Sequence, residues 1–110
     1  MGDDARVYAT PSIVEDLEYA CRDLLLEHLD PGCDSVGARV EIEHLRATPM
    51  GFTATHRVKV SAVDGRRVTF EVEVHDGVET VAKATHARFV VKVDRLKAAI
   101  ADKAAQKPKG

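Results

Sequence analysis

The stretch Tyr8–His28, YATPSIVEDLEYACRDLLLEH, decides the fold that the sequence predicts. Its apolar residues recur every three or four positions, so at 100° per residue they gather on one arc and the charged residues on the other. Thr10 is a suitable N-cap, and Pro11 suits the first helical position, where a missing N–H leaves no donor unpaired. Asp30-Pro31-Gly32 ends the pattern. We therefore predict a helix of about 17 residues, which buries Ile13, Val14, Leu17, Ala20, Cys21, Leu24 and Leu25.

Downstream of this helix, apolar and polar residues alternate, which is typical of half-buried strands. Asp64-Gly65 and Asp76-Gly77 are hairpin signals, because Gly permits the positive φ of tight turns. In the last strand the alternation slips near Thr85–Arg88, and a bulge is its simplest cause. The first strand is expected to turn Val36, Ala38, Val40, Ile42 and His44 inward. The predicted strands cover residues 36–45, 52–63, 68–75 and 78–93.

One helix followed by four antiparallel strands, arranged as a meander that wraps the helix, is an α+β fold. We treat residues 1–110 as one domain, with a short N-terminal segment (1–7) and a C-terminal part (97–110) that is helical and then disordered. Helical propensity begins at Asp94. With 110 residues, 45% of them apolar, the core is small, and the sheet edges are exposed. Pairing those edges between two copies would add burial, so a homodimer is expected.

Composition excludes several classes of function. The formal net charge of −2, with 31% charged residues of mixed sign, gives no field that would attract nucleic acid or an acidic membrane. No apolar run approaches the roughly 20 residues of a membrane span, and no signal peptide is recognisable, so we expect a cytoplasmic protein. Cys21 and Cys33 are expected to be reduced. The four histidines after the helix lack metal-ligand spacing, so neither a metal nor a cofactor is expected: His44, His56, His75 and His86.

Three residues interrupt their local patterns and could carry chemistry. Thr10 places a hydroxyl at the start of the helix, Glu18 a carboxylate at the border of its apolar arc, and His44 an imidazole at the inward end of the first strand. Each has a plain structural interpretation as a cap, a solvated border residue or a core histidine. Together they supply a nucleophile, an orienting acid and a base. His86 could line a pocket, and Arg88 could meet phosphates.

Three strings of the sequence carry a family resemblance: YATPSIVEDLEYAC, SVGARVEIEHLRATPMG and ATHARFVV. They resemble the thioesterase family typified by fluoroacetyl-CoA thioesterase, which has a hot-dog fold, over about Val7 to Leu96. The family's motifs are an Ala-Thr before the helix, a Glu eight residues after that Thr, a Gly seven residues before a His, and an Ala-Thr-Pro-x-Gly after it. In this sequence they fall on Thr10, Glu18, Gly37, His44 and residues 47–51.

The resemblance implies a Thr10, Glu18 and His44 catalytic set, Gly37 close to the acyl group, and active sites at a dimer interface. It implies a thioesterase that converts a short or small acyl-CoA to carboxylate and free CoA. The family's aromatic lid has no counterpart within Met1–Tyr8, and Ala84 and Ala87 replace a Gly and a Glu of the family's late motif. The alternative functions are a non-catalytic hot-dog module that binds an acyl-CoA or a small aromatic or acyl ligand, and a structural dimer without a ligand.

Overall fold

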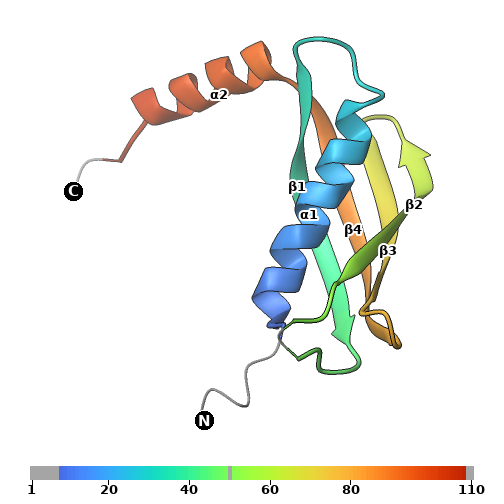
Figure 1. The fold of residues 1–110 in the computed structure, drawn as a ribbon. Helices are drawn as coiled ribbons and strands as arrows, with labels where there is room; N and C mark the ends of the chain where they lie inside the picture. The colour runs from blue at the N-terminus through green and yellow to red at the C-terminus, as the bar shows by residue number, and fades with distance from the viewer. Residues whose placement is uncertain (1–7, 50, 109–110) are drawn as a thin grey trace.

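The computed structural model describes residues 8–49 and 51–108 (Figure 1). The 17-residue helix and the antiparallel strands confirm the predicted α+β arrangement. Every strand begins and ends within three residues of its predicted bounds. The predicted N-terminal segment, residues 1–7, lies outside the described residues. The elements are α1 (Thr10–Leu26), β1 (Cys33–His44), β2 (Thr55–Asp64), β3 (Arg67–His75), β4 (Thr80–Lys92) and α2 (Val93–Ala105).

The four strands form one sheet in the order β1-β4-β3-β2. Strands β2, β3 and β4 are a meander, but β1 pairs with β4, so the predicted meander is wrong at its first strand. Residues 45–54 separate β1 from β2, and this segment is too long for a tight hairpin. It passes the start of α1, where the Tyr8 N–H donates to the Thr48 carbonyl at 2.9 Å. Strands β1 and β2 are therefore the two edges of the sheet.

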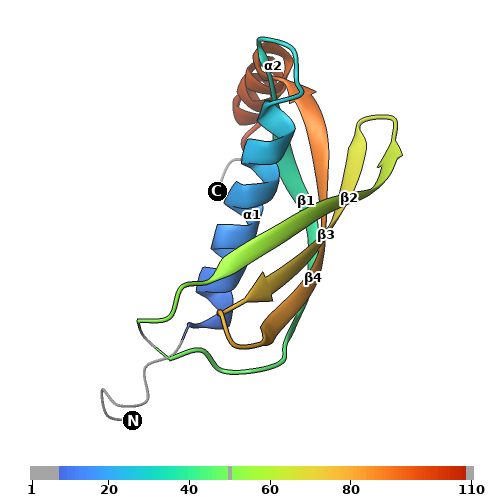
Figure 2. The same cartoon turned by 45° about the vertical axis from the view of Figure 1, so that its right-hand side comes forward.

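The core lies between α1 and one face of the sheet. Figure 2 shows α1 running along the inside of the curved sheet. The buried side chains of α1 are spaced four residues apart, so they form one stripe along the helix. Each fully buried aliphatic side chain contributes about 1.5–3 kcal/mol to folding. The core cluster comprises Ile13, Leu17, Cys21 and Leu25 of α1 with Val68, Phe70, Val72, Val74, Val81, Ala82 and Ala84 of the sheet.

A bulge in β1 corrects two expectations. Gly37 pairs with Arg88 and Arg39 with Ala87, so Ala38 is an extra residue in β1, while β4 runs through Thr85–Arg88 without a break. The bulge predicted in that part of β4 is therefore wrong: its alternation looks irregular because two polar residues take inward positions. In β1, Ser35 is 6% exposed and Val36 is 38% exposed. The bulge thus turns Ser35 and Gly37, rather than Val36 and Ala38, toward α1.

Helix α2 carries the helical pattern expected from Asp94 onward, and it projects past the β1 edge (Figure 1). It is tied to the body at its start, where the Val93 N–H donates to the Gly32 carbonyl at 2.9 Å. None of its residues is buried, and Ile100 is 60% exposed. Within residues 8–49 and 51–108, neither helix is long and apolar enough to cross a membrane.

Candidate active site

Thr10 is the first residue of α1, but it does not cap the helix. The N-cap is Ala9, which has no side-chain capping bond, and Pro11 follows Thr10 in the first turn. The Thr10 hydroxyl lies instead 2.8 Å from Nδ1 of His44, at the end of β1. The predicted cap is therefore wrong, and the hydroxyl is directed at the imidazole.

His44 is half-buried, and its second ring nitrogen is unsatisfied. Within the described part of the chain, His44 Nε2 is a buried side-chain atom without a hydrogen-bond partner. Such a group costs about 1–3 kcal/mol unless another molecule satisfies it. If Thr10 donates to Nδ1, Nε2 carries the proton and needs an acceptor; if Nδ1 donates to Thr10, Nε2 is a base for a proton. In either tautomer, Nε2 is left without a partner among the described residues.

Glu18 lies two turns farther along α1 than Thr10. Eight residues of helix span about 12 Å, so the structure does not bring Glu18 to His44 of the same chain. The carboxylate faces the β1 bulge: a Cβ built on Gly37 would lie 3.3 Å from Glu18 Oε1. The same Cβ would lie 3.5 Å from His86 Cε1 and 3.7 Å from Arg88 Nη1. The structure therefore forms two groups, Thr10 with His44 and Glu18 with Gly37, His86 and Arg88.

Arg88 is a buried charge and not part of a solvated surface. Its side chain lies on the α1 face of β4 and is 6% exposed. Nε donates to Ser35 Oγ at 2.7 Å, and Nη2 donates to the Ser35 carbonyl at 2.9 Å. Burial lowers the pKa of the guanidinium, and the charge of Glu18 opposes this shift. Sequence reasoning missed Ser35, because the regular alternation that ignores the bulge places this residue outward.

A second polar cluster lies beside the start of β2. The Tyr8 hydroxyl donates to the Asp16 carboxylate, and His56 Nε2 lies 3.4 Å from the Tyr8 oxygen. Burial, with a smaller contribution from Asp16, raises the pKa of Tyr8. Burial lowers the pKa of His56, which is half-buried as the alternation predicted. These residues border a cavity of about 430 Å³ that Phe52 also lines.

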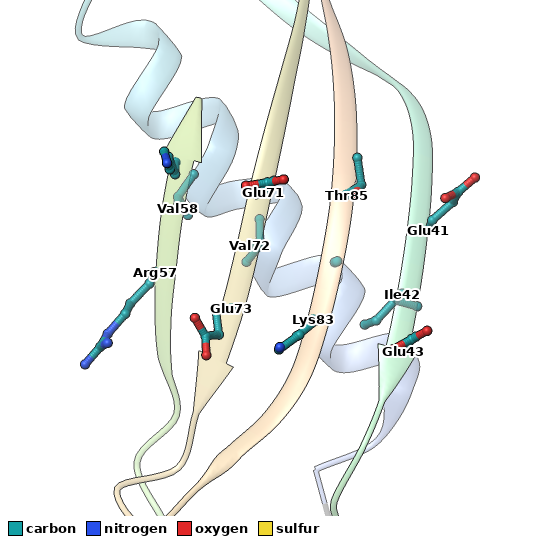
Figure 3. A pocket seen from close by; sticks show the side chains of 12 residues that line it. Glu41, Ile42, Glu43, Arg57, Val58, Glu71, Val72, Glu73, Lys83 and Thr85 are labelled. Carbon is teal, nitrogen blue, oxygen red and sulfur yellow. The ribbon is translucent and has the colours of Figure 1, made fainter. Parts of the chain in front are cut away.

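A hollow larger than this cavity lies on the face of the sheet opposite α1 (Figure 3). Its volume is about 640 Å³, and charged side chains from all four strands project over it. It contains none of the predicted site residues. Among the described residues, no group of three or more His, Cys, Asp or Glu side chains could hold a metal ion.

Comparison with known proteins identifies the family of the chain. The model of the fluoroacetyl-CoA-specific thioesterases matches residues 1–94. The fluoroacetyl-CoA thioesterase of Streptantibioticus cattleyicolor is 35% identical over 97 residues, which are 88% of this chain and 70% of the relative.

Solved structures show the same fold. A mutant of the fluoroacetyl-CoA-specific thioesterase FlK, in complex with fluoroacetate and CoA, matches with a TM-score of 0.83 at 34% identity, over 92% of this chain and 80% of that one. A hot-dog-like protein from Thermanaerovibrio acidaminovorans matches with a TM-score of 0.83 at 28% identity, over 86% of this chain and 70% of that one. The chain therefore has the hot-dog fold and belongs to the family of fluoroacetyl-CoA-specific thioesterases.

Proposed function

We propose that this chain hydrolyses the thioester of a short or small acyl-CoA to a carboxylate and free CoA. The observation that carries the proposal is the 2.8 Å contact between Thr10 Oγ1 and His44 Nδ1, beside an Nε2 that no group in residues 8–49 and 51–108 satisfies. Family membership supports the reaction class, because the matched relatives are thioesterases of fluoroacetyl-CoA. Catalysis is assigned to Thr10, Glu18 and His44.

The start of α1 is suited to polarise the thioester carbonyl. The first N–H groups of a helix have no intrahelical partner, and the helix dipole favours negative charge there. Pro11 supplies no N–H, and the Ile13 N–H already donates to the Ala9 carbonyl, so the donors are the backbone N–H groups of Thr10 and Ser12, or that of Gly37. An oxyanion that forms at this end would be stabilised as the carbonyl carbon becomes tetrahedral.

His44 acts as the base in the proposed reaction. It takes a proton from a water molecule or from the Thr10 hydroxyl as that oxygen adds to the carbonyl carbon. Collapse of the tetrahedral intermediate breaks the C–S bond, and His44 returns the proton to the sulfur of CoA. If Thr10 is the nucleophile, a water molecule then cleaves the resulting ester by the same steps.

Gly37 borders the acyl group in this proposal. The space above it is bounded by Glu18 and by the two inward polar side chains of β4, His86 and Arg88. A side chain at position 37 would enter that space, since its Cβ alone would approach Glu18 Oε1 to 3.3 Å. The absence of a side chain leaves room for a small acyl group.

The catalytic set requires a second copy of the chain. Glu18 is about 12 Å along the helix from Thr10, so the Glu18 that serves His44 is assigned to another subunit of a homodimer. Antiparallel pairing of two β1 edges would place the Gly37 region of one copy near the His44 end of the other. The unsatisfied Nε2 of His44 supports this arrangement, since a carboxylate of the second copy would give it a partner.

Helix α2 also supports the homodimer. Its 13 residues are marginal as an isolated helix, because helices of fewer than about 12–15 residues depend on packing. Leu96, Ile100 and Ala104 form an apolar stripe on it, and Ile100 is 60% exposed. The helix projects past β1 and is about 20 Å long, which is about four strand spacings. A second copy paired along β1 would lie within its reach.

We place the enzyme in the cytoplasm, where CoA thioesters and reduced thiols coexist. Cys21 and Cys33 are both free, and Cys21 is buried in the core. Burial raises the pKa of the Cys21 thiol to about 12, so it stays protonated. These cysteines need no oxidising compartment.

Release of free CoA from a panel of acyl-CoA thioesters, followed with a thiol-detecting dye, tests the activity. We expect turnover of fluoroacetyl-, acetyl- or propionyl-CoA and little turnover of long-chain thioesters. The His44→Ala variant, checked for folding by circular dichroism, serves as the blank. Tight binding of acyl-CoA without release of CoA would instead establish the non-catalytic binding module.

A further inference from the structure

His86 is a fully buried histidine whose two ring nitrogens have partners of opposite kind. Its side chain is 0% exposed and stacks against the ring of Phe70, with centroids 6.4 Å apart. Nδ1 lies 2.8 Å from the carbonyl oxygen of Arg39, and Nε2 lies 3.2 Å from Nη1 of Arg88. These contacts determine where its proton lies.

Only one tautomer satisfies both contacts. A carbonyl oxygen can only accept, so Nδ1 carries the hydrogen; a guanidinium can only donate, so Nε2 presents its lone pair. A proton on Nε2 would set two donors against each other. Burial lowers the pKa of His86, and the charge of Arg88 lowers it further, while the Arg39 carbonyl and Glu18 oppose the shift. His86 is therefore neutral and is not a general acid or base near pH 7.

The partners of His86 and Arg88 lie on both sides of the β1 bulge. Arg88 binds Ser35 before the extra residue Ala38, and His86 binds the carbonyl of Arg39 after it. The contact between His86 and Arg88 joins these two attachments. Two side chains of β4 thus hold the bulge that turns Gly37 toward Glu18.

The same contacts orient the buried charge. Of the three nitrogens of the Arg88 guanidinium, two donate to Ser35 and the third, Nη1, donates to His86. Nη1 is also the nitrogen that lies 3.7 Å from the Cβ position at Gly37. Without His86, Nη1 would lose its only protein acceptor among the described residues, and the end of the guanidinium beside Gly37 would be free to turn.

We propose that His86 is a positioning residue for the thioesterase reaction: as a neutral acceptor, it fixes the Arg88 guanidinium beside Gly37 and Glu18. The inference rests on the proposed function and refines it, because it assigns His86 a role behind Arg88 and no direct contact with the substrate. Burying a cation is costly unless all its surroundings are arranged for it, so the arrangement is sensitive to a single acceptor.

Two substitutions separate the two contacts of His86. His86→Gln can keep an acceptor for Arg88, whereas His86→Asn can keep a donor for the Arg39 carbonyl, and His86→Leu removes both. We expect kcat to fall at least tenfold in His86→Leu and His86→Asn, with a smaller change in KM, and to recover substantially in His86→Gln. His56→Leu, which removes an inward histidine of β2 that lies outside the proposed catalytic set, is the matched control and should keep kcat within about threefold of wild type. Wild-type kcat in His86→Asn, or failure of His86→Gln to recover beyond His86→Leu, would overturn the proposal.

A measurement on the wild-type protein does not depend on how the variants fold. In ¹⁵N-labelled protein, the ring nitrogens of His86 should show hydrogen on Nδ1 and a lone pair on Nε2, unchanged from pH 6 to pH 8.5. Hydrogen on Nε2, or titration of the ring within this range, would overturn the proposal. The spectrum can be recorded without any enzymatic turnover. If the proposed thioesterase function is wrong, the wild-type protein will be inactive, but the ring of His86 will still show hydrogen on Nδ1 and a lone pair on Nε2.

Discussion

At the scale of single residues, Thr10 and His44 are the pair on which the chemistry depends. His44→Ala should lower kcat by about 100-fold to 10,000-fold, the usual contribution of a general base. His56→Ala removes an imidazole that packs on Tyr8 and should mainly lower thermal stability. Steady-state kinetics and melting temperatures of both variants check this contrast. Equal losses of kcat in His44→Ala and His56→Ala would contradict the assignment of His44 as the general base.

The hydroxyl of Thr10 gives a second test at this scale. Thr10→Ser retains the oxygen near His44 Nδ1 and should keep part of the rate, whereas Thr10→Ala should lose more. Because α1 is capped at Ala9 without a side-chain bond, Thr10→Ala removes no cap, and its effect on unfolding should be limited to the lost contact with His44 Nδ1, about 0.5–1.5 kcal/mol. Kinetics and urea unfolding of both variants measure this. Full activity in Thr10→Ala would exclude the hydroxyl as nucleophile.

At the scale of elements, the outer face of the sheet carries a row of alternating charge (Figure 3). Glu43, Lys83, Glu73 and Arg57 are direct cross-strand neighbours from β1 to β2. Lys83→Glu would set three carboxylates side by side and should destabilise the fold by about 0.5–1 kcal/mol. Lys83→Gln removes the attraction to Glu43 and Glu73 without adding a repulsion, so it should lower the free energy of unfolding by less than Lys83→Glu.

Salt distinguishes this effect from a packing defect. The charges are exposed, so about 1 M NaCl should screen the repulsion and restore part of the stability of Lys83→Glu. Urea midpoints of both variants with and without salt measure the difference. A loss that salt leaves unchanged would show that Lys83 matters through its aliphatic stem and not through its charge.

The periodicity of apolar residues predicted the helices and strands, but it did not predict the bulge in β1. The spacing of Ile13, Leu17, Cys21 and Leu25 predicted α1 because a buried stripe on a helix leaves a direct trace in sequence. The bulge at Ala38 leaves no such trace, since it depends on contacts with a strand about fifty residues away. Sequence therefore assigned the wrong inward residues to the first half of β1.

The candidate site was predictable where polar residues interrupt an apolar pattern. Thr10, Glu18 and His44 were found in this way, and the structure joins Thr10 to His44 but sets Glu18 apart. Ser35 and the Tyr8–Asp16 pair were missed, because these polar residues occupy positions where the pattern of apolar residues already predicts an exposed side chain. Pairings between distant elements depend on strand order, which alternation does not specify.

At the scale of the whole molecule, acid should weaken the fold before carboxylates protonate. Burial holds the pKa of His86 below its ordinary value of 6.5 in the folded chain, so the unfolded chain takes up the proton first as pH falls. The contribution of neutral His86 to the free energy of unfolding is complete above pH 6.5 and declines below it, by at most about 1.4 kcal/mol per pH unit. Asp34 and Asp76 have lowered pKa values, so their contributions are lost only at lower pH.

Urea unfolding at pH 7.5 and pH 5.5 measures this dependence. The midpoint should be lower at pH 5.5, with circular dichroism showing the same fold before denaturant is added. Burial also lowers the pKa of His56, so both histidines contribute in the same direction. An equal or higher midpoint at pH 5.5 would contradict a lowered pKa for these two buried imidazoles.

Mixing two inactive variants tests whether the sites are shared between copies. Suppose that each site combines His44 of one chain with Glu18 of the other. A dimer of one Glu18→Gln chain and one His44→Ala chain then has one site with both native residues and one site with both substitutions. After mixing and exchange of equal amounts, about a quarter of wild-type activity should return. If Glu18 served His44 of its own chain, every site would carry one defect and no activity would return. Light scattering at each step should give the mass of a dimer of the 12.0 kDa chain.

The bulge in β1 also sets a competition between two strand registers. If the extra residue Ala38 were absorbed into a regular ladder, β1 would slip by one position, and Val36 and Ala38 would turn inward in place of Ser35 and Gly37. The slipped register buries more aliphatic surface, whereas the observed one depends on the polar contacts of Ser35 with Arg88. The fold therefore holds a local frustration at its candidate site, where hydrophobic burial and polar pairing favour different registers. Weakening the polar contacts should populate the slipped register as a second folded species in slow exchange with the first.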